Sequence, residues 1–176
     1  MYRALCSGLL FALALSVLPA AAQPSWQNQI AVTGGPQITT GAFGDGFKTG
    51  SGLAATYYYR PSSHFFFGLR GGFHRFQPQG GGARFDILPL QFASKYNFSI
   101  TGVQPYVGFD GGLYLLRPEG GDGSSEFGVA PKFGLRIPIA SGVDIDLNAT
   151  YEVILQDPEN TTYVGLNAGF AYIFGR

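Results

Sequence analysis

Apolar and polar residues alternate with a period of two near the end of the chain. In residues 143–155 every odd position is apolar, whereas the even positions from Asp144 to Glu152 are acidic or polar. Residues 127–139 and 164–174 alternate in a similar way. Because successive side chains of a β-strand point to opposite faces of a sheet, each segment is predicted to be a strand with one apolar face.

Five earlier segments are predicted to be strands on the same grounds, with phases chosen to fit the pattern. They cover residues 28–39, 51–60, 65–76, 84–96 and 104–116. The phase of the fourth segment is set by Lys95, which places Leu90 and Phe92 on its apolar face. No Asp, Glu, Lys or Arg then falls on an apolar face.

The links between these segments alternate in length. Short links cover residues 61–64, 97–103 and 140–142, and longer links rich in glycine and acidic residues cover 43–50, 77–82, 117–126 and 156–161. Short turns at one end and longer loops at the other are typical of bacterial outer-membrane barrels. An even number of strands places both termini at the short-turn, periplasmic end.

The predicted fold is an all-β, eight-stranded, antiparallel, up-and-down transmembrane β-barrel. An open sheet in lipid would leave edge N–H and C=O groups unpaired, and closing the sheet pairs them. The apolar faces therefore contact lipid and the polar faces fill the lumen. Eight strands enclose a lumen just wide enough for side chains.

Charged side chains of both signs fall on the lumen face, and their charges nearly balance. The predicted lumen charge network consists of Arg70, Lys95, Asp110, Lys132, Arg136, Asp144, Asp146 and Glu152. Arg60 and His74 are placed in the lumen as well. We expect ion pairs there, because an unpaired buried charge is very costly. Inward glycines are expected to leave space for Tyr58, Tyr106 and Tyr114.

The first 22 residues have the layout of a secretory signal peptide. Arg3 precedes a short apolar run, and residues 20–22 are all alanine. We expect cleavage after Ala22, which leaves residues 23–176 as one barrel domain. An uncleaved anchor is the alternative, but the run is short for a membrane-spanning helix. The only cysteine, Cys6, would be removed with the leader.

Composition agrees with a membrane barrel and disfavours a soluble domain. Charged residues make up 12% of the chain, against about 25% in average soluble domains. The formal net charge is zero, so no positive field attracts nucleic acid. A soluble lipocalin-like carrier would show the reverse arrangement, with an apolar lumen and a charged outer wall.

Two segments resemble the OmpA/OmpX-type family of small bacterial outer-membrane β-barrels. The last predicted strand contains Asn167-x-Gly169-x-x-Tyr172-x-Phe174, which resembles the β-signal read by the barrel assembly machinery. Residues 87–108 resemble the family's mid-barrel hairpin, and the likeness extends over residues 23–176. It implies a location in the bacterial outer membrane and contact with its lipids. Unlike many relatives, the chain continues for two residues beyond the final aromatic.

No catalytic, cofactor or metal site is predicted. His64 follows Ser62 and Ser63 in a short turn, but adjacency in a turn does not align a base with a nucleophile. His74 is expected to form hydrogen bonds in the lumen. The acidic loop 119–126 lacks the ligand spacing of an EF-hand.

The sequence favours a non-enzymatic, monomeric outer-membrane barrel with a plugged polar lumen. Its role would be structural in the envelope, or adhesion-like through a surface ligand bound by the loops. A narrow gated pore is the first alternative, and it requires the lumen ion pairs to rearrange. A lipid-modifying enzyme at the outer rim is the second, since family membership alone does not determine activity.

Overall fold

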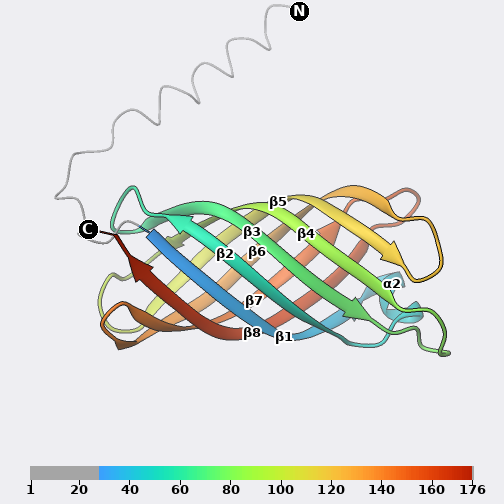
Figure 1. Ribbon diagram of the computed structural model, residues 1–176, viewed down its shortest axis with the longest axis horizontal. Coiled ribbons are helices and arrows are strands. Elements are labelled where there is room, and N and C mark those ends of the chain that lie inside the picture. Colours follow the sequence, from blue (N-terminus) through green and yellow to red (C-terminus); the bar gives the residue numbers. More distant parts are fainter. Residues whose placement is uncertain (1–27, 176) are drawn as a thin grey trace, which may run out of the picture.

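The computed structural model describes residues 28–175 as a closed barrel in which every strand pairs with its sequence neighbours (Figure 1). The strands are β1 (Asn28–Thr40), β2 (Gly50–Tyr59), β3 (Phe65–Phe76), β4 (Phe85–Asn97), β5 (Gln104–Pro118), β6 (Ser124–Ala140), β7 (Val143–Ile154) and β8 (Thr161–Phe174), and a short helix, α2 (Gly41–Gly46), follows β1. The predicted eight-stranded antiparallel barrel is confirmed. The expected signal peptide, residues 1–22, lies outside the described residues.

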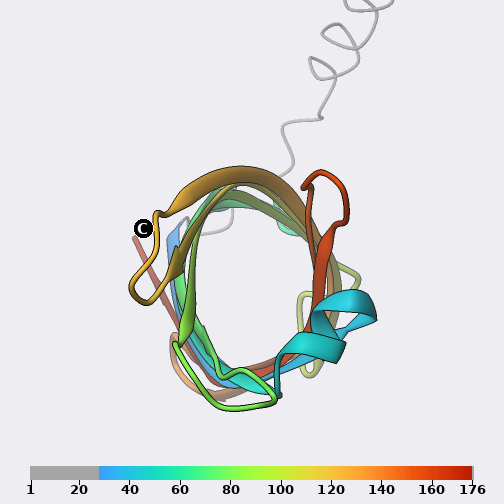
Figure 2. The same ribbon diagram turned by 90° about the vertical axis from the view of Figure 1, so that its right-hand side faces the viewer.

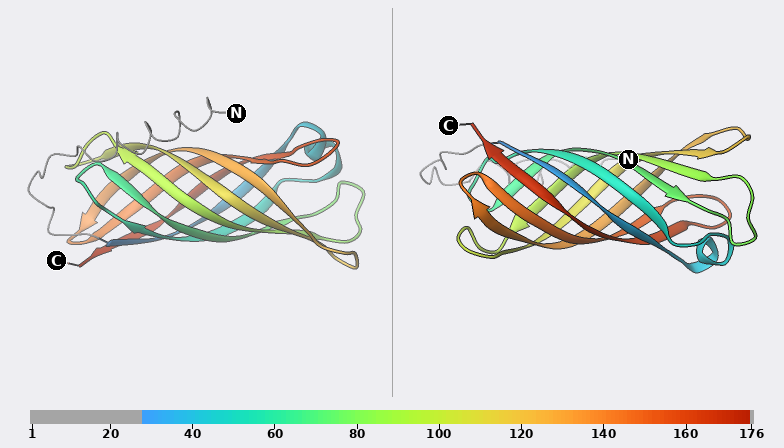
Figure 3. Two further views of the ribbon diagram at one scale, coloured as in Figure 1. Left: turned by 90° about the horizontal axis from the view of Figure 1, so that it is seen from above. Right: turned by 60° about the horizontal axis from the view of Figure 1, so that its bottom comes forward.

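The first and last strands close the barrel, and the pairing of Asn28 with Phe174 places both at the same end. We call this the short-turn end, since it contains the connections at residues 60–64, 98–103 and 141–142. The opposite, long-loop end contains α2 and the other three loops (Figures 1 and 3). Viewed along the barrel axis, the strands form a closed ring with α2 at its rim (Figure 2).

The strand bounds differ from the predicted ones by a few residues, and the largest difference is in the hairpin of β5 and β6. Their pairing continues to Leu116 opposite Ser124, so the connecting loop covers residues 119–123 rather than 117–126. The sequence pattern missed this extension because the backbone hydrogen bonds of the hairpin continue beyond the segment in which apolar and polar side chains alternate.

The helix α2 was not predicted, and its segment was expected to be a loop from residue 43. Its sequence, GAFGDG, contains three glycines and has poor helix propensity. It begins at Gly41, whose φ of 60° is readily adopted only by glycine. Phe43, within the helix, has a buried side chain, so tertiary packing rather than local preference stabilises this turn of helix.

The outer wall is apolar, as predicted. Leu69 and Phe170 are 66% and 62% exposed on it. On β4, Leu90 and Phe92 are exposed while Lys95 is buried, which confirms the phase chosen for that strand. Among the described residues, no helix has the length and apolar character needed to cross a membrane.

Candidate functional site

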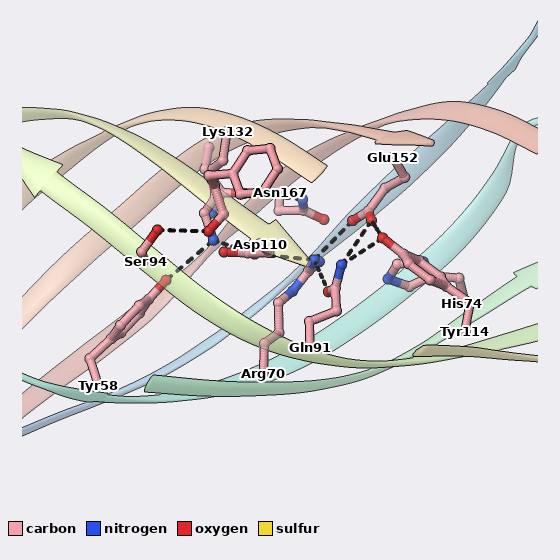
Figure 4. Close-up of polar contacts among 12 residues, drawn as sticks. Tyr58, Arg70, His74, Gln91, Ser94, Asp110, Tyr114, Lys132, Glu152 and Asn167 are labelled. Atoms are coloured by element: carbon pink, nitrogen blue, oxygen red, sulfur yellow. Dashed lines mark hydrogen bonds and ion pairs between the residues drawn. The ribbon is translucent and has the colours of Figure 1, made fainter. Parts of the chain in front are cut away.

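The centre of the lumen contains a network of buried charges that spans the barrel (Figure 4). Arg70 on β3 donates from Nη1 to Glu152 Oε1 on β7 at 2.9 Å and to Gln91 Oε1 on β4 at 2.8 Å. The same nitrogen lies 3.5 Å from Asp110 Oδ2 on β5. Since β3 and β7 are four strands apart in a ring of eight, the pair Arg70–Glu152 joins opposite walls.

A second cross-lumen contact is made by Lys132 on β6. Its Nζ lies 2.6 Å from Asp110 Oδ2 and donates to the Tyr58 hydroxyl on β2 at 3.2 Å. Asp110 is therefore shared by two cations, Arg70 and Lys132. Each of these three side chains is at least nine-tenths buried, so removing one partner would leave a buried charge without compensation.

The carboxylate of Glu152 is also held by neutral donors. It accepts a hydrogen bond from the Tyr114 hydroxyl and another from Gln91 Nε2 at 3.5 Å. Towards the long-loop end, His74 Nδ1 lies 2.8 Å from the Tyr163 hydroxyl. His74 is thus in a lumen hydrogen bond, as expected from the sequence.

Inward glycines make room for the large tyrosines. A Cβ at Gly128 would lie 2.5 Å from Tyr114 Cε2, and a Cβ at Gly134 would collide with the ring of Tyr106. The absence of a side chain on β6 therefore allows two rings from β5 to fill the lumen beside the charges.

The half of the lumen nearer the short-turn end contains the remaining predicted charges. Arg136 forms an ion pair with Asp144. Asp146 instead accepts hydrogen bonds from the Tyr106 hydroxyl at 2.8 Å and from Asn148 Nδ2 at 3.0 Å.

Lys95 departs from the expectation of paired charges. Among the described residues it has no carboxylate partner within ion-pair distance. Its Nζ donates to Gln29 Oε1 at 2.8 Å and lies 4.3 Å from the centre of the Tyr58 ring. The rings of Phe66 and Tyr106 lie 4.9 and 5.1 Å from the same nitrogen, so aromatic faces stabilise this ammonium.

All eight residues of the predicted network are buried in the lumen, and six of them form ion pairs. The six are Arg70, Asp110, Lys132, Arg136, Asp144 and Glu152. Lys95 and Asp146 are held by uncharged partners. Arg60 lies at the short-turn mouth, half-buried, and donates to the backbone carbonyls of Ser62 and Ser63.

The lumen near the long-loop end is apolar, which sequence reasoning missed. We define the apolar plug as Phe43, Phe76, Ile87, Tyr114, Leu116, Ile154 and Tyr163. Phe43 of α2 lies 5.0 Å from the Phe76 ring at 75° and 6.4 Å from the Tyr163 ring. The signal was present in the sequence, because inward positions become apolar at the strand ends, as Phe76 does two positions after His74.

Little free space remains at the centre of the lumen. The cavity between the charge network and the short-turn half has a volume of about 10 Å³ and is bordered by Thr56, Lys132 and Thr150. This is close to the minimum for a single water molecule.

The remaining candidate groups, His64 and Ser62, make local contacts at the short-turn end. The ring of His64 stacks on Tyr96 at 5.7 Å, and Ser62 Oγ accepts from the Phe65 amide. No group of three or more metal-ligating side chains occurs in the part of the chain that the structure describes.

The residues of the predicted assembly signal lie on two faces of β8. Asn167 is buried, accepts from Gln37 Nε2 at 3.0 Å and donates to Asn148 Oδ1 at 3.1 Å. A Cβ at Gly169 would collide with the Val32 carbonyl oxygen of β1. The rings of Tyr172 and Phe174 stack at 5.9 Å at the short-turn end. Hydrogen bonds in the lumen thus account for Asn167, and the close approach of β1 accounts for Gly169.

A closed barrel with an apolar outer wall and a charged lumen defines the class of small transmembrane β-barrels. The chain belongs to the family described as outer membrane protein beta-barrel domain, which matches residues 9–174. It is therefore a protein of the bacterial outer membrane, and in such barrels the short turns face the periplasm. No curated protein matches the chain by sequence.

Solved structures of other outer-membrane proteins have the same fold. Neisserial surface protein A (NspA) superposes with a TM-score of 0.69 at 18% identity, over 84% of this chain and 97% of its own. OprG of Pseudomonas aeruginosa gives 0.56 at 16% identity, over 88% and 98%. Ail, the attachment invasion locus protein of Yersinia pestis, gives 0.52 at 18% identity, over 85% and 100%.

Proposed function

We propose that this protein is a non-conducting, non-enzymatic barrel that acts in the envelope through its rigid fold and its surface loops. The observation that carries the proposal is the filling of the lumen from its long-loop end to its centre. The apolar plug occupies the long-loop end, the charge network occupies the centre, and the cavity beside the network measures about 10 Å³.

The cross-lumen contacts oppose the opening of a path for ions. Arg70–Glu152 and Lys132–Tyr58 each connect strands on opposite walls. A pore through the centre would require both contacts to break, and breaking one buried pair costs about 3–5 kcal/mol. A hydrated ion would also have to pass the plug, where aromatic and aliphatic side chains offer few polar partners.

The long-loop end supplies the surface on which a partner would act. Its loops contain charges of both signs, and the base of the β3–β4 loop is braced by the bidentate ion pair of Arg75 with Asp86 at 2.8 and 2.9 Å. A rigid rim presents its side chains at little entropic cost on binding. The name of Ail refers to attachment, which gives one surface role compatible with this fold.

An enzyme at the outer rim would need a nucleophile activated by a base, and neither described histidine is hydrogen-bonded to a serine or threonine hydroxyl. His74 is 1% exposed and bonded to Tyr163, and His64 lies at the periplasmic end. Both positions are unsuited to attack on a substrate in the outer leaflet.

The test is planar-bilayer conductance of the refolded protein, after heat-modifiable gel mobility has shown that it is folded. We expect the wild type to be silent. The double variant Arg70→Ala/Glu152→Ala removes a cross-lumen pair and should increase leakage events, whereas Leu69→Ala on the lipid face serves as a matched control and should remain silent.

Steady, ion-selective steps from the wild type would contradict a non-conducting barrel and favour the gated pore. The surface role is tested separately, by the detergent sensitivity of a deletion strain and by its complementation with variants in the loops. Full complementation by a barrel with all long loops replaced by glycine and serine would contradict a role for those loops.

A further inference from the structure

A polar cavity of about 170 Å³ opens at the periplasmic end, beyond the charge network. It lies between the end of β2, the turn of residues 98–103 that precedes β5, the turn between β6 and β7, and the end of β8. Two arginines, two uncharged polar side chains and two isoleucines line it: Arg60, Arg136, Gln104, Ser141, Ile100 and Ile173. Ser141 and Ile100 are exposed, so the cavity is accessible from the periplasm.

Local backbone geometry fixes one wall of this cavity. Ser141 and Gly142 form the two-residue turn between β6 and β7, and Gly142 has a φ of 76° that favours glycine. The Ile173 amide of β8 donates to the Gly142 carbonyl at 2.7 Å. The turn is therefore tied to the last strand, and the exposed residue Ser141 lies at the mouth.

Both arginines have hydrogen-bonding capacity that the described residues do not use. Arg60 donates only to the carbonyls of Ser62 and Ser63, at 3.1 and 2.9 Å, and none of the described carboxylates pairs with it. Arg136 is 2% exposed and pairs with Asp144 through Nη2, while its buried Nε has no hydrogen-bond partner in the described part of the chain.

Positive charge is in excess at this end of the lumen. Arg60, Arg136 and Lys95 all lie around the ring of Phe66, at 5.3, 5.5 and 4.9 Å from its centre. Two described carboxylates lie at this end, Asp144, which pairs with Arg136, and Asp146, which accepts from the Tyr106 hydroxyl, so three cations face two anions.

This excess of charge is unfavourable without a further partner. Burial lowers the pKa of the Arg60 guanidinium, and the charge of Arg136 lowers it further. Arginine nevertheless stays protonated in proteins. The repulsion between the Arg60 and Arg136 guanidinium groups therefore persists unless an anion from outside the chain neutralises it. An anion in the cavity would contact both guanidinium groups and relieve it.

We propose that this cavity binds a phosphate-class oxyanion between Arg60 and Arg136. Guanidinium groups match the oxygens of phosphate in charge and geometry, and the Ser141 hydroxyl at the mouth can donate a further hydrogen bond. The isoleucine walls suit a phosphate attached to an apolar group as well as the free ion. The two sources are inorganic phosphate in the periplasm and the phosphodiester of a lipid in the periplasmic leaflet.

The test is a phosphate titration of the refolded protein in uncharged maltoside micelles, followed by the backbone amide NMR signals of Ser141 and Gly142. We expect saturable shifts that Arg60→Gln weakens by about tenfold or more, since a charge-assisted contact is lost. Arg84→Gln, an exposed arginine in a loop at the opposite end, is the matched control and should leave the Kd unchanged.

Ser141→Glu provides a second variant in an exposed turn, where folding should not be affected. It places a carboxylate at the mouth and should abolish the phosphate response. Repeating the wild-type titration in phosphatidylcholine nanodiscs identifies the source. An unchanged Kd assigns the site to the free ion, and a weakened Kd assigns it to the lipid phosphodiester that competes there.

Three results would overturn the proposal. The shifts at Ser141 and Gly142 could fail to saturate, or sodium chloride at equal ionic strength could reproduce them. Alternatively, Arg60→Gln and Arg84→Gln could weaken the response equally, which would indicate general charge screening. Conductance does not enter this test, so its outcome is independent of the proposed non-conducting role.

Discussion

The centre and the long-loop end of the lumen are filled by different physical means. At the centre, Arg70, Lys132 and Asp110 are fully surrounded by protein and held by ion pairs and hydrogen bonds. At the long-loop end, Phe76 and Tyr163 pack ring against ring at 5.2 Å. The two regions occupy one cylinder, with Glu152 and Ile154 only two positions apart on β7.

The centre of the lumen and its long-loop end should therefore respond differently to mutation. In an apolar cluster, the cost of a smaller side chain grows with the cavity that remains. In a buried ion network, the cost comes from the charge that loses its partner. A change of similar volume should therefore be more damaging at the centre than in the apolar plug.

Glu152→Ala should have the largest effect. It removes the acceptor for Arg70 at 2.9 Å and for the Tyr114 hydroxyl, and it leaves the buried guanidinium with Asp110, 3.5 Å away, as its only described carboxylate partner. The free energy of unfolding should fall by about 3–5 kcal/mol, measured by urea titration in lipid vesicles. Removing both charges, in Arg70→Met/Glu152→Met, should restore part of the loss, and a double variant worse than the single one would contradict the argument.

Leu147→Arg tests whether charge is tolerated on the outer wall as it is in the lumen. Leu147 is 39% exposed and lies mid-strand on the lipid-facing side of β7. Placing a guanidinium in the hydrocarbon region should cost about 2–4 kcal/mol in bilayers. An unfolding curve identical to that of the wild type would show that the faces have been assigned wrongly.

Ile154→Val should have a smaller effect within the apolar plug. Ile154 is fully buried, and loss of one methylene group typically costs about 0.5–1.5 kcal/mol. The neighbouring Leu155→Val, on the exposed side of the chain, is the control and should change the free energy of unfolding very little. A loss in the plug as large as that for Glu152→Ala would remove the distinction between the two regions.

Phe174→Ala should change stability least and still affect the cell. Its ring stacks on Tyr172 outside the lumen, so neither the network nor the plug depends on it. If the C-terminal motif acts as an assembly signal, outer-membrane levels should fall while folding in vitro remains close to normal. Heat-modifiable mobility on gels measures how much folded variant is present in the outer membrane. An amount equal to that of the wild type would argue against a role in assembly.

Period-two alternation was enough to predict the strands and their faces. Each strand exposes one face to lipid and buries the other, so the segments around Lys132 and Asp146 could be oriented from their neighbours alone. On β6 and β7 alternation alone placed Lys132, Arg136, Asp144, Asp146 and Glu152 on the buried face, whereas Lys95 was itself used to choose the phase of β4. The apolar plug was missed because an inward face was taken to be polar along its whole length, although Phe76 and Ile87 break that pattern.

Local alternation and the need to pair backbone groups in lipid were sufficient to predict the class of fold, the lumen and lipid faces, and most of the buried charges. The tertiary structure decided which charges meet. Arg70 and Glu152 are 82 residues apart in the chain, and only the register of the closed barrel brings them to the same level. Helix α2 and the surroundings of Lys95 also depend on the closed barrel, because Phe43 packs on Phe76 and Tyr163, and the Lys95 ammonium is held by Gln29 and by the rings of Tyr58, Phe66 and Tyr106.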